Sequence, residues 1–295
     1  MWKRHYSVSK HSDYKKDKMK IKQNDLILEL KKKSAIVRQH VVKMAAEGKT
    51  SHVGSALSCV DILVALYFKV LNIAPDNWKE PDCDRFILSK GHGSMAWYAT
   101  LAERGFISIE TLGEYSVDGG RLGEHPDCGN IPGILVTTGS LGHGLSVGLG
   151  MALAKKMDER HSNVYVLLSD GECNEGSVWE SAMYAAHRKA DNLIAIIDYN
   201  NMQAMGRSTE VNAIEPLVEK WRAFGWAVRE IDGHNLNEIT AILNQIPFEA
   251  NKPSMIIAHT VLGKGVSFME DDLLWHYQIP SPEQVKKALE ELELP

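Results

Sequence analysis

The sequence predicts an α/β fold in which a parallel central sheet is covered by helices on both faces. Short apolar runs alternate along the chain with stretches whose apolar residues recur at helical spacing, which is typical of this class. In residues 164–201, two apolar runs flank one helical pattern, and polar residues follow each run. With 295 residues and 44% hydrophobic content, the chain can bury a large core. No repeat or low-complexity linker divides it, so we expect one domain over residues 22–295.

The N-terminal residues are basic and polar. They contain no apolar segment of the kind that secretory signals carry, and Asp13 and Asp17 disfavour a transit peptide. We therefore predict a disordered extension over residues 1–21. From residue 24 to 47, leucine, isoleucine and valine recur among charged residues, which predicts a first helix.

Helices and strands then follow one another to the C-terminus. The further helices are expected at residues 59–70 and 94–104, from just after residue 144 to about 157, from about 174 to 189, from about 235 onward, and at 282–292. The strands are short apolar runs, expected within residues 82–90 and at 164–168, 193–197, 227–231 and 255–258. Glycine- and proline-containing loops are expected at residues 48–55 and 105–133.

Polar residues end both strands of the unit at residues 164–201. Asp170 follows the first strand and Asn200 follows the second. Ligands of open parallel sheets bind beyond the carboxyl ends of the strands, so these two side chains are expected to lie close together. A carboxylate and an amide oxygen suit Mg²⁺, which takes few protein ligands. Two ordinary turns are the alternative, because Asp, Asn and Gly favour turns, but their register on one unit favours a metal site.

A glycine-rich loop over residues 139–144 precedes a helix that is expected to run to about residue 157. Its glycines let backbone N–H groups approach an anion, and a helix N-terminus adds a favourable dipole. Close packing of the helix on a neighbouring strand is the alternative explanation. A nicotinamide-binding role is disfavoured, because the acidic residue that would bind the ribose is not at the required position.

Four histidines lie in predicted loops. They are His52, His92, His125 and His276. A single loop histidine is more often a solvated surface residue, but four in such contexts suggest that they converge on one pocket. Neutral imidazoles can form hydrogen bonds with sugar hydroxyls and move protons, and charged ones help to neutralise a diphosphate.

Composition excludes several classes of protein. The net charge of −5 argues against nucleic acid as a partner. No apolar run approaches the length of a membrane span. The cysteines lack the spacing of a zinc site, which fits a reducing compartment; they are Cys59, Cys83, Cys128 and Cys173. We therefore expect a soluble, cytoplasmic protein.

These segments together resemble the transketolase family. The unit at residues 164–201 is similar to the thiamine diphosphate signature, a GDG followed about thirty residues later by NN. The stretches EGSVWESAMYAA, TTGSLG, SHVG, DRFILSKGH, EHP and EDDLLWH also match family motifs. The chain departs from the family pattern at Ser169, where a glycine is usual, at Val53, where a proline is usual, and at Leu262, where many members have lysine. Lys264 is the candidate to replace that lysine electrostatically.

The resemblance implies a thiamine diphosphate-binding fold and a role for each matching residue. The metal, Mg²⁺ with Ca²⁺ or Mn²⁺ as substitutes, would be held by Asp170, Asn200 and the main-chain carbonyl of Met202. The cofactor would contact Ser55, His92, Gly139, Ser140, Leu141, Gly171, Glu172, Asn200 and His276. The donor ketose and its reaction would involve His52, His125 and His276.

The resemblance covers residues 25–280, which correspond to the diphosphate-binding domain of a protein more than twice as long. It therefore implies one subunit of a split transketolase, which transfers a two-carbon unit between sugar phosphates. The partner chain would carry the pyrimidine-binding domain and its activating glutamate, most simply in an α₂β₂ assembly. A subunit of a thiamine enzyme that uses 2-oxo acids, and a non-catalytic scaffold or regulator, remain alternatives.

Overall fold

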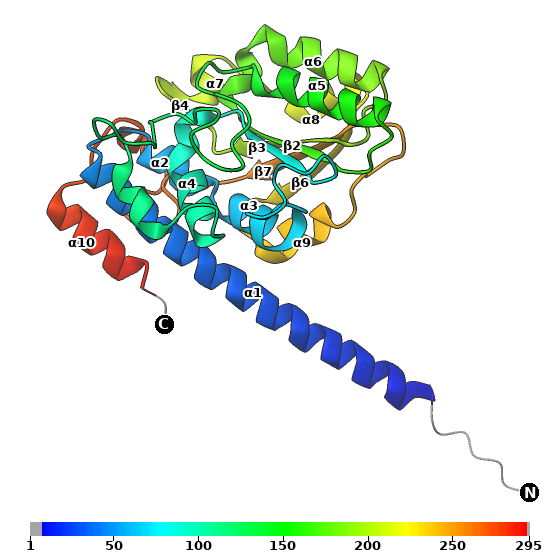
Figure 1. Cartoon of the computed structure of the whole chain (residues 1–295), viewed down its shortest axis with the longest axis horizontal. Coiled ribbons are helices and arrows are strands. Elements are labelled where there is room, and N and C mark those ends of the chain that lie inside the picture. Colours follow the sequence, from blue (N-terminus) through cyan, green and yellow to red (C-terminus); the bar gives the residue numbers. More distant parts are fainter. Residues whose placement is uncertain (1–7, 294–295) are drawn as a thin grey trace, which may run out of the picture.

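A five-stranded parallel sheet forms the centre of the molecule (Figure 1). The computed structural model describes residues 8–293. Strand order across the sheet is β1-β2-β3-β7-β6, and every neighbouring pair is parallel. The strands are β1 (Arg85–Leu88), β2 (Val164–Ser169), β3 (Leu193–Tyr199), β6 (Ala227–Asp232) and β7 (Ser254–His259). The predicted α/β fold and all five predicted strands are confirmed.

Helices cover both faces of the sheet because successive strand residues point to opposite sides. In β3, Ile194 and Ile196 belong to one hydrophobic cluster, whereas Ala195 and Ile197 belong to another. The first cluster lies against α1 (Val8–Glu47), α3 (Val60–Ala65), α4 (Ser94–Glu103) and α9 (Leu236–Leu243). The second lies against α5 (Gly144–Met157), α6 (Gly176–His187) and α8 (Leu217–Ala223), the green and yellow helices of Figure 1.

The second predicted helix begins earlier than residue 59. Helix α2 (Val53–Ser58) follows His52 directly, and a break at Cys59 separates it from α3 and the π-helix Leu66–Val70. His52 adopts a left-handed conformation, with φ of 70°, which ends the loop abruptly. The residues of α2 are all buried but include glycine and serine, so no apolar period marks this helix in the sequence.

Short elements between β3 and β6 escaped the sequence analysis. They are a hairpin of β4 (Met202–Gln203) and β5 (Gly206–Arg207), helix α7 (Ser208–Val211) and helix α8. Elements of two to seven residues give too little periodicity to be predicted. Four 3₁₀ segments lie in predicted loops or turns, at Gly91–Gly93, Ile109–Glu114, Gly171–Asn174 and Leu273–His276.

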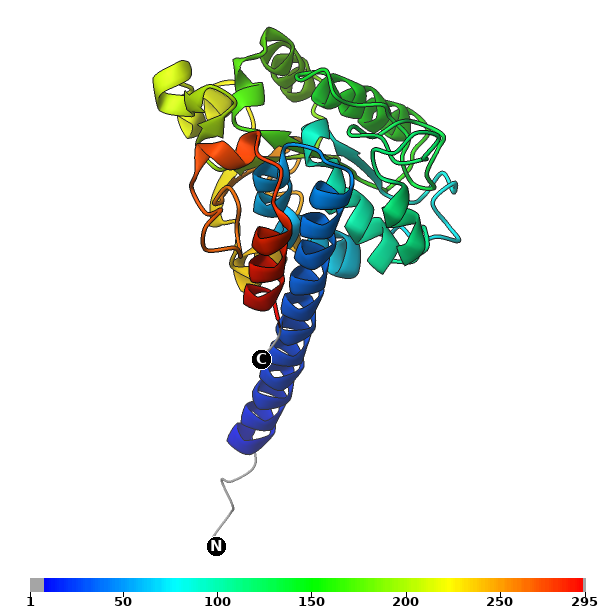
Figure 2. The same ribbon diagram turned by 90° about the vertical axis from the view of Figure 1, so that its left-hand side faces the viewer.

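The two terminal helices pack side by side (Figure 2). Helix α10 (Pro282–Glu291) starts with a capping box formed by Ser281 and Gln284. Helix α1 begins at Val8, well before the start expected at residue 24, and its N-terminal part projects from the body of the molecule. Residues 1–7 of the expected disordered extension lie outside the described part, and the domain limit at residue 22 stays a prediction. Within residues 8–293, no helix is long and apolar enough to cross a membrane.

Candidate active site

A cavity of about 400 Å³ opens beyond the carboxyl ends of β2 and β3. This is where ligands bind in open α/β sheets, and the size suits a cofactor. The sequence-predicted residues that line it are His52, Ser55, His92, His125, Gly139, Leu141, Asp170, Gly171, Asn200, Met202 and His276. Ser140 and Glu172 are predicted site residues that do not line it. Ser169, Asn174, Glu175, Gln203 and Ala204 also line the cavity, although the sequence analysis gave them no ligand-binding role.

Asp170 lies at the floor of the cavity and is almost completely buried. Its carboxylate accepts hydrogen bonds from the Gly171 N–H and the Ser208 hydroxyl, both at 2.8 Å. Burial raises the pKa of Asp170 to about 6, because the negative charge has lost most of its hydration. A cation bound here would stabilise the ionised carboxylate in place of the lost hydration, so the carboxylate is suited to bind one.

Asn200 stands at the end of the neighbouring strand. β2 and β3 are paired in register up to Ser169 and Asp198, so Asp170 and Asn200 both follow the paired segment. The Met202 N–H donates to Asn200 Oδ1 over 3.0 Å, which holds the amide against the start of β4. Asp170, Asn200 and the Met202 carbonyl supply a carboxylate, an amide oxygen and a main-chain oxygen. Such hard oxygen donors fit Mg²⁺, and the residues present therefore fit the expected metal.

Three of the predicted histidines form one cluster. The ring centroids of His52 lie 5.4 Å from His92 and 5.1 Å from His276, and those of His92 and His276 are 6.1 Å apart. His52 Nδ1 and His276 Nδ1 are 3.2 Å apart, so one ring donates and the other accepts. The His52 N–H also donates to the His276 carbonyl. His125 lines the same cavity, so the predicted convergence of the four imidazoles is found.

The clustered imidazoles are neutral at pH 7. Burial, followed by the neighbouring His276, His125 and Lys90, lowers the pKa of His52 to about 4. Burial also lowers the pKa values of His92 and His276, and Lys90 adds to both shifts. Neutral rings can both donate and accept, which suits them to the hydroxyls and carbonyl of a sugar.

The glycine-rich loop reaches the cavity at only two of its positions. Gly139 and Leu141 line it, whereas Ser140 is exposed outside it. A Cβ on Gly139, whose φ is 146°, would lie 3.2 Å from the His125 ring. The loop therefore needs glycine there both for its backbone conformation and for the close approach of His125.

Glu172 links segments that surround the cavity without lining the cavity itself. It is fully buried and accepts hydrogen bonds from the Gly142 N–H at 2.8 Å, the Ser169 N–H at 3.2 Å and the Ser89 hydroxyl. Burial raises its pKa, and these donors oppose that effect. The predicted cofactor contact of Glu172 is thus replaced by a link between the end of β2 and the glycine-rich loop.

One of the departures from the family pattern, Leu262, has a local explanation. Leu262 is fully buried and packs against α2, where a Cβ on Gly54 would lie 2.9 Å from its Cγ. Lys264 pairs with Glu270 at 3.1 Å and does not line the cavity, so it does not take the place of the missing lysine there. Ser169 lines the cavity and donates its N–H to Glu172, a contact that glycine would also make, so the structure does not explain the serine.

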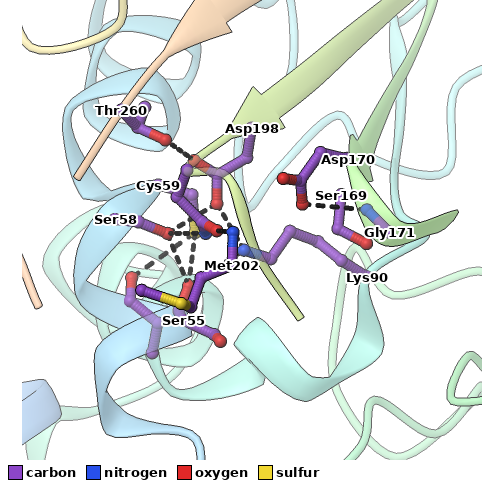
Figure 3. A network of polar contacts seen from close by, with 12 residues as sticks. Ser55, Ser58, Cys59, Lys90, Ser169, Asp170, Gly171, Asp198, Met202 and Thr260 are labelled. Atoms are coloured by element: carbon purple, nitrogen blue, oxygen red, sulfur yellow. Dashed lines mark hydrogen bonds and ion pairs between the residues drawn. The ribbon is translucent and has the colours of Figure 1, made fainter. Parts of the chain in front are cut away.

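A buried ion pair that the sequence did not reveal lies next to the cavity (Figure 3). Lys90 and Asp198 are both fully buried and in contact. Lys90 Nζ also donates to the Ser55 carbonyl at 2.9 Å, and Asp198 accepts from the hydroxyls of Ser58 and Thr260. The only sequence signal was a charged residue near the end of an otherwise apolar strand.

Comparisons with known proteins agree on one family. A family model described as transketolase, thiamine diphosphate binding domain, matches residues 31–289. A subunit of the apulose-4-phosphate transketolase of Phocaeicola vulgatus is 45% identical over 258 residues, covering 86% of this chain and 90% of that protein. The 6-deoxy-6-sulfo-D-fructose transketolase subunit SqwG of Clostridium sp. is 44% identical over 266 residues, covering 90% and 97%.

Solved transketolases share the fold. The Campylobacter jejuni enzyme superposes with a TM-score of 0.83 at 28% identity, covering 89% of this chain. The Leishmania mexicana enzyme gives a TM-score of 0.82 at 26% identity, covering 88%. The match spans only 42% and 40% of those two chains. The chain therefore belongs to the transketolase family, in which it corresponds to the thiamine diphosphate-binding domain.

Proposed function

We propose that this chain is the thiamine diphosphate- and Mg²⁺-binding subunit of a transketolase, which transfers a two-carbon ketol unit from a ketose phosphate to an aldose phosphate. The observation that carries the proposal is that Asp170, Asn200 and Met202 line the same cavity as the clustered histidines. The first set suits a metal-bound diphosphate, and the second suits the hydroxyls of a sugar.

The residues of the metal end would hold the cofactor. Asp170, Asn200 and the Met202 carbonyl would bind the cation, and Gly171 would let the diphosphate approach the backbone closely. Ser55, His92, Gly139, Leu141 and His276 line the same cavity and would complete the cofactor contacts. When bound, thiamine diphosphate supplies a carbanion that can attack a ketose carbonyl and retain the two-carbon fragment.

The histidines would act on the substrate. Because His52 and His276 share a hydrogen bond between their Nδ1 atoms, one Nε2 carries a proton and the other is free to accept one. The pair would thus offer one donor and one acceptor to the donor ketose. His125, at the exposed rim, would contact a hydroxyl of the same sugar.

A second chain would complete the enzyme. The relatives named as subunits span nearly the whole of this chain, whereas the solved transketolases are much longer. We infer a partner that carries the pyrimidine-binding domain and the activating glutamate, in an α₂β₂ assembly. A cytoplasmic location is consistent with the four free cysteines.

Reconstitution with the partner tests the proposal. The chain, combined with a pyrimidine-domain subunit, thiamine diphosphate and Mg²⁺, should convert a ketose phosphate and an aldose phosphate into new sugars, and neither chain should do so alone. Activity on pyruvate without any on ketoses would instead support a 2-oxo acid enzyme. Failure of the assembled pair to bind thiamine diphosphate would support a non-catalytic scaffold.

A further inference from the structure

A chain of hydrogen bonds runs from the buried Lys90–Asp198 pair to Asn200, behind the wall of the cavity. We propose that Ser58 is a positioning residue that fixes the orientation of the Asn200 amide, so that its oxygen and not its nitrogen is presented to the metal. This inference rests on the proposed function, which supplies the metal. It assigns Ser58, on helix α2, a role that its sequence position does not suggest.

The orientation of the Asn200 amide follows from its two neighbours. The Met202 N–H can only donate, so the atom it meets at 3.0 Å is the amide oxygen. The amide nitrogen therefore lies on the opposite side, where it meets Ser58 Oγ at 3.4 Å. This arrangement satisfies both ends of the amide, and Oδ1 keeps a second lone pair for a cation.

Ser58 can serve the amide only as an acceptor. Its hydroxyl has one proton, and the oxygens within reach of that proton are Asp198 Oδ2 and the Ser55 carbonyl, the latter at 3.0 Å. With the proton used on either of them, the lone pairs of Oγ remain for the Asn200 amide nitrogen. The arrangement of donors and acceptors thus runs in one direction, from the amide through Ser58 to the carboxylate.

Lys90 maintains that direction at the far end of the chain. Its ammonium contacts the same Asp198 oxygen that accepts from Ser58. Because both side chains are fully buried, solvent cannot take the place of either group in this pair. Asp198 therefore stays a hydrogen-bond acceptor on the side of Ser58. Figure 3 shows Lys90, Asp198 and Ser58 meeting next to Asp170 and Met202.

Thr260 provides a matched control. Its hydroxyl donates to Oδ1 of Asp198, the other oxygen of the same carboxylate, and forms no hydrogen bond with Asn200. Loss of either hydroxyl removes one hydrogen bond from the buried carboxylate. Only loss of the Ser58 hydroxyl also removes the acceptor of the Asn200 amide, so the two variants separate a positioning role from a purely structural one.

The test uses the assembled protein, which is the full chain with its pyrimidine-domain partner. Its affinity for Mn²⁺ in the presence of thiamine diphosphate is measured by electron paramagnetic resonance. Ser58→Ala should weaken Mn²⁺ binding about 10- to 100-fold, the range known for groups that orient metal ligands. Thr260→Val should stay within about 2-fold of the unaltered protein. Thermal unfolding of both variants should show similar losses of stability.

If Ser58→Ala folds poorly, Ser58→Cys takes its place in the test, because it keeps a small side chain but offers only a weak acceptor. It should weaken Mn²⁺ binding by a similar factor. Equal Mn²⁺ affinities in the Ser58 and Thr260 variants, with tight binding by the unaltered protein, would overturn the role of Ser58 and leave the proposed function intact. Absence of Mn²⁺ and thiamine diphosphate binding by the unaltered assembly would overturn both.

Discussion

Two buried ion pairs in this molecule show how similar chemistry serves different ends. Lys90–Asp198 lies at the end of β3, where the carboxylate also accepts from the hydroxyls of Ser58 and Thr260. The Ser58 hydroxyl in turn meets the Asn200 amide. Arg38–Asp61 lies between α1 and α3, where the guanidinium binds the carboxylate through two nitrogens, at 3.0 and 2.6 Å. The first pair borders the cavity, and the second borders only packed helices and loops.

The second pair, Arg38–Asp61, stabilises the packing of distant segments of the chain and does not border the cavity. Arg38 Nε donates to the Lys264 carbonyl, and His234 bridges Asp61 to the Val261 N–H. Burial alone would raise the pKa of Asp61, but the guanidinium and His234 hold it well below its usual range. The difference between the pairs teaches that burial of charge does not by itself mark an active site. The groups around the pair distinguish the two. Lys90–Asp198 lies near the candidate metal ligand Asn200, whereas Arg38–Asp61 is surrounded by backbone groups that already have hydrogen-bond partners.

The largest effect is expected at the metal end of the cavity. Asp170→Ala should abolish Mg²⁺-dependent binding of thiamine diphosphate, because it removes the only carboxylate in the predicted ligand set. The fold should remain, since a buried carboxylate with a raised pKa costs stability when it is ionised. Calorimetric titration and thermal unfolding would measure the two effects.

Asp158→Ala is the control, because Asp158 is exposed at the end of α5. It should bind the cofactor normally. Normal metal-dependent cofactor binding by Asp170→Ala would refute the metal assignment. The ion pair Lys90–Asp198 would then have no metal site beside it.

The next effect is on turnover. His276→Ala should lower kcat of the reconstituted enzyme about 10²- to 10⁴-fold, the range for a group that takes part in proton transfer. Its unfolding free energy should change far less, since the ring faces a cavity on one side. His161→Ala, at an exposed histidine, should leave kcat unchanged. A variant at His276 that unfolds readily but turns over normally would show that this histidine is structural.

At the second ion pair, stability should respond and binding should not. Arg38→Met should lower the free energy of unfolding by about 3–5 kcal/mol, because it leaves the Asp61 charge buried without its main partner. The double variant Arg38→Met with Asp61→Leu should regain much of that loss. Denaturant titration would measure both, and cofactor affinity should stay within about 2-fold. A loss of affinity larger than the loss of stability would contradict the division between the two regions.

The smallest effect concerns acid stability. The pKa of His52 falls from 6.5 to about 4 on folding, because burial and the charges of His276, His125 and Lys90 disfavour its protonated form. Between these values the unfolded chain binds more protons than the folded one, so stability should fall as pH decreases from 6.5 to 4 and be unaffected by this group above 6.5. After discounting for partial exposure, the contribution of His52 is about 2 kcal/mol.

His52→Gln should therefore flatten the decline in stability between pH 6.5 and 4 without removing it, because His92 and His276 shift in the same direction. Unfolding free energies at several pH values would measure the slope. An unchanged slope would mean that folding does not lower the pKa of His52, and it would contradict the burial of this ring as a neutral hydrogen-bonding group.

The sequence predicted the features that repeat or that end in a recognisable turn. All five strands, the helices with several apolar turns, and the positions of Asp170, Asn200 and the four histidines are as expected. Helix α2 was missed because it has only six residues, all of them buried, and glycine and serine among them interrupt any apolar period. Pairwise contacts between distant residues, such as Lys90 with Asp198 or Glu172 with Gly142, leave no local pattern at all.

Glu172 shows where resemblance alone is insufficient. The resemblance implied that Glu172 contacts the cofactor, but Glu172 lies in a 3₁₀ segment, is not among the residues that line the cavity and accepts a hydrogen bond from the Gly142 N–H. Which way a side chain points after a strand depends on that one turn, and its geometry is not encoded in residue type. The metal end and the histidine end of the cavity were therefore predictable, and the buried support between them was not.

The most direct test of the account is anomalous diffraction from crystals of the assembled enzyme with thiamine diphosphate and Mn²⁺. We expect a manganese peak at coordination distance from the Asp170 carboxylate, Asn200 Oδ1 and the Met202 carbonyl, with the diphosphate between Gly171 and the histidine cluster. A manganese peak at another place on the chain, or cofactor density with none of these three oxygens bound to the metal, would contradict it.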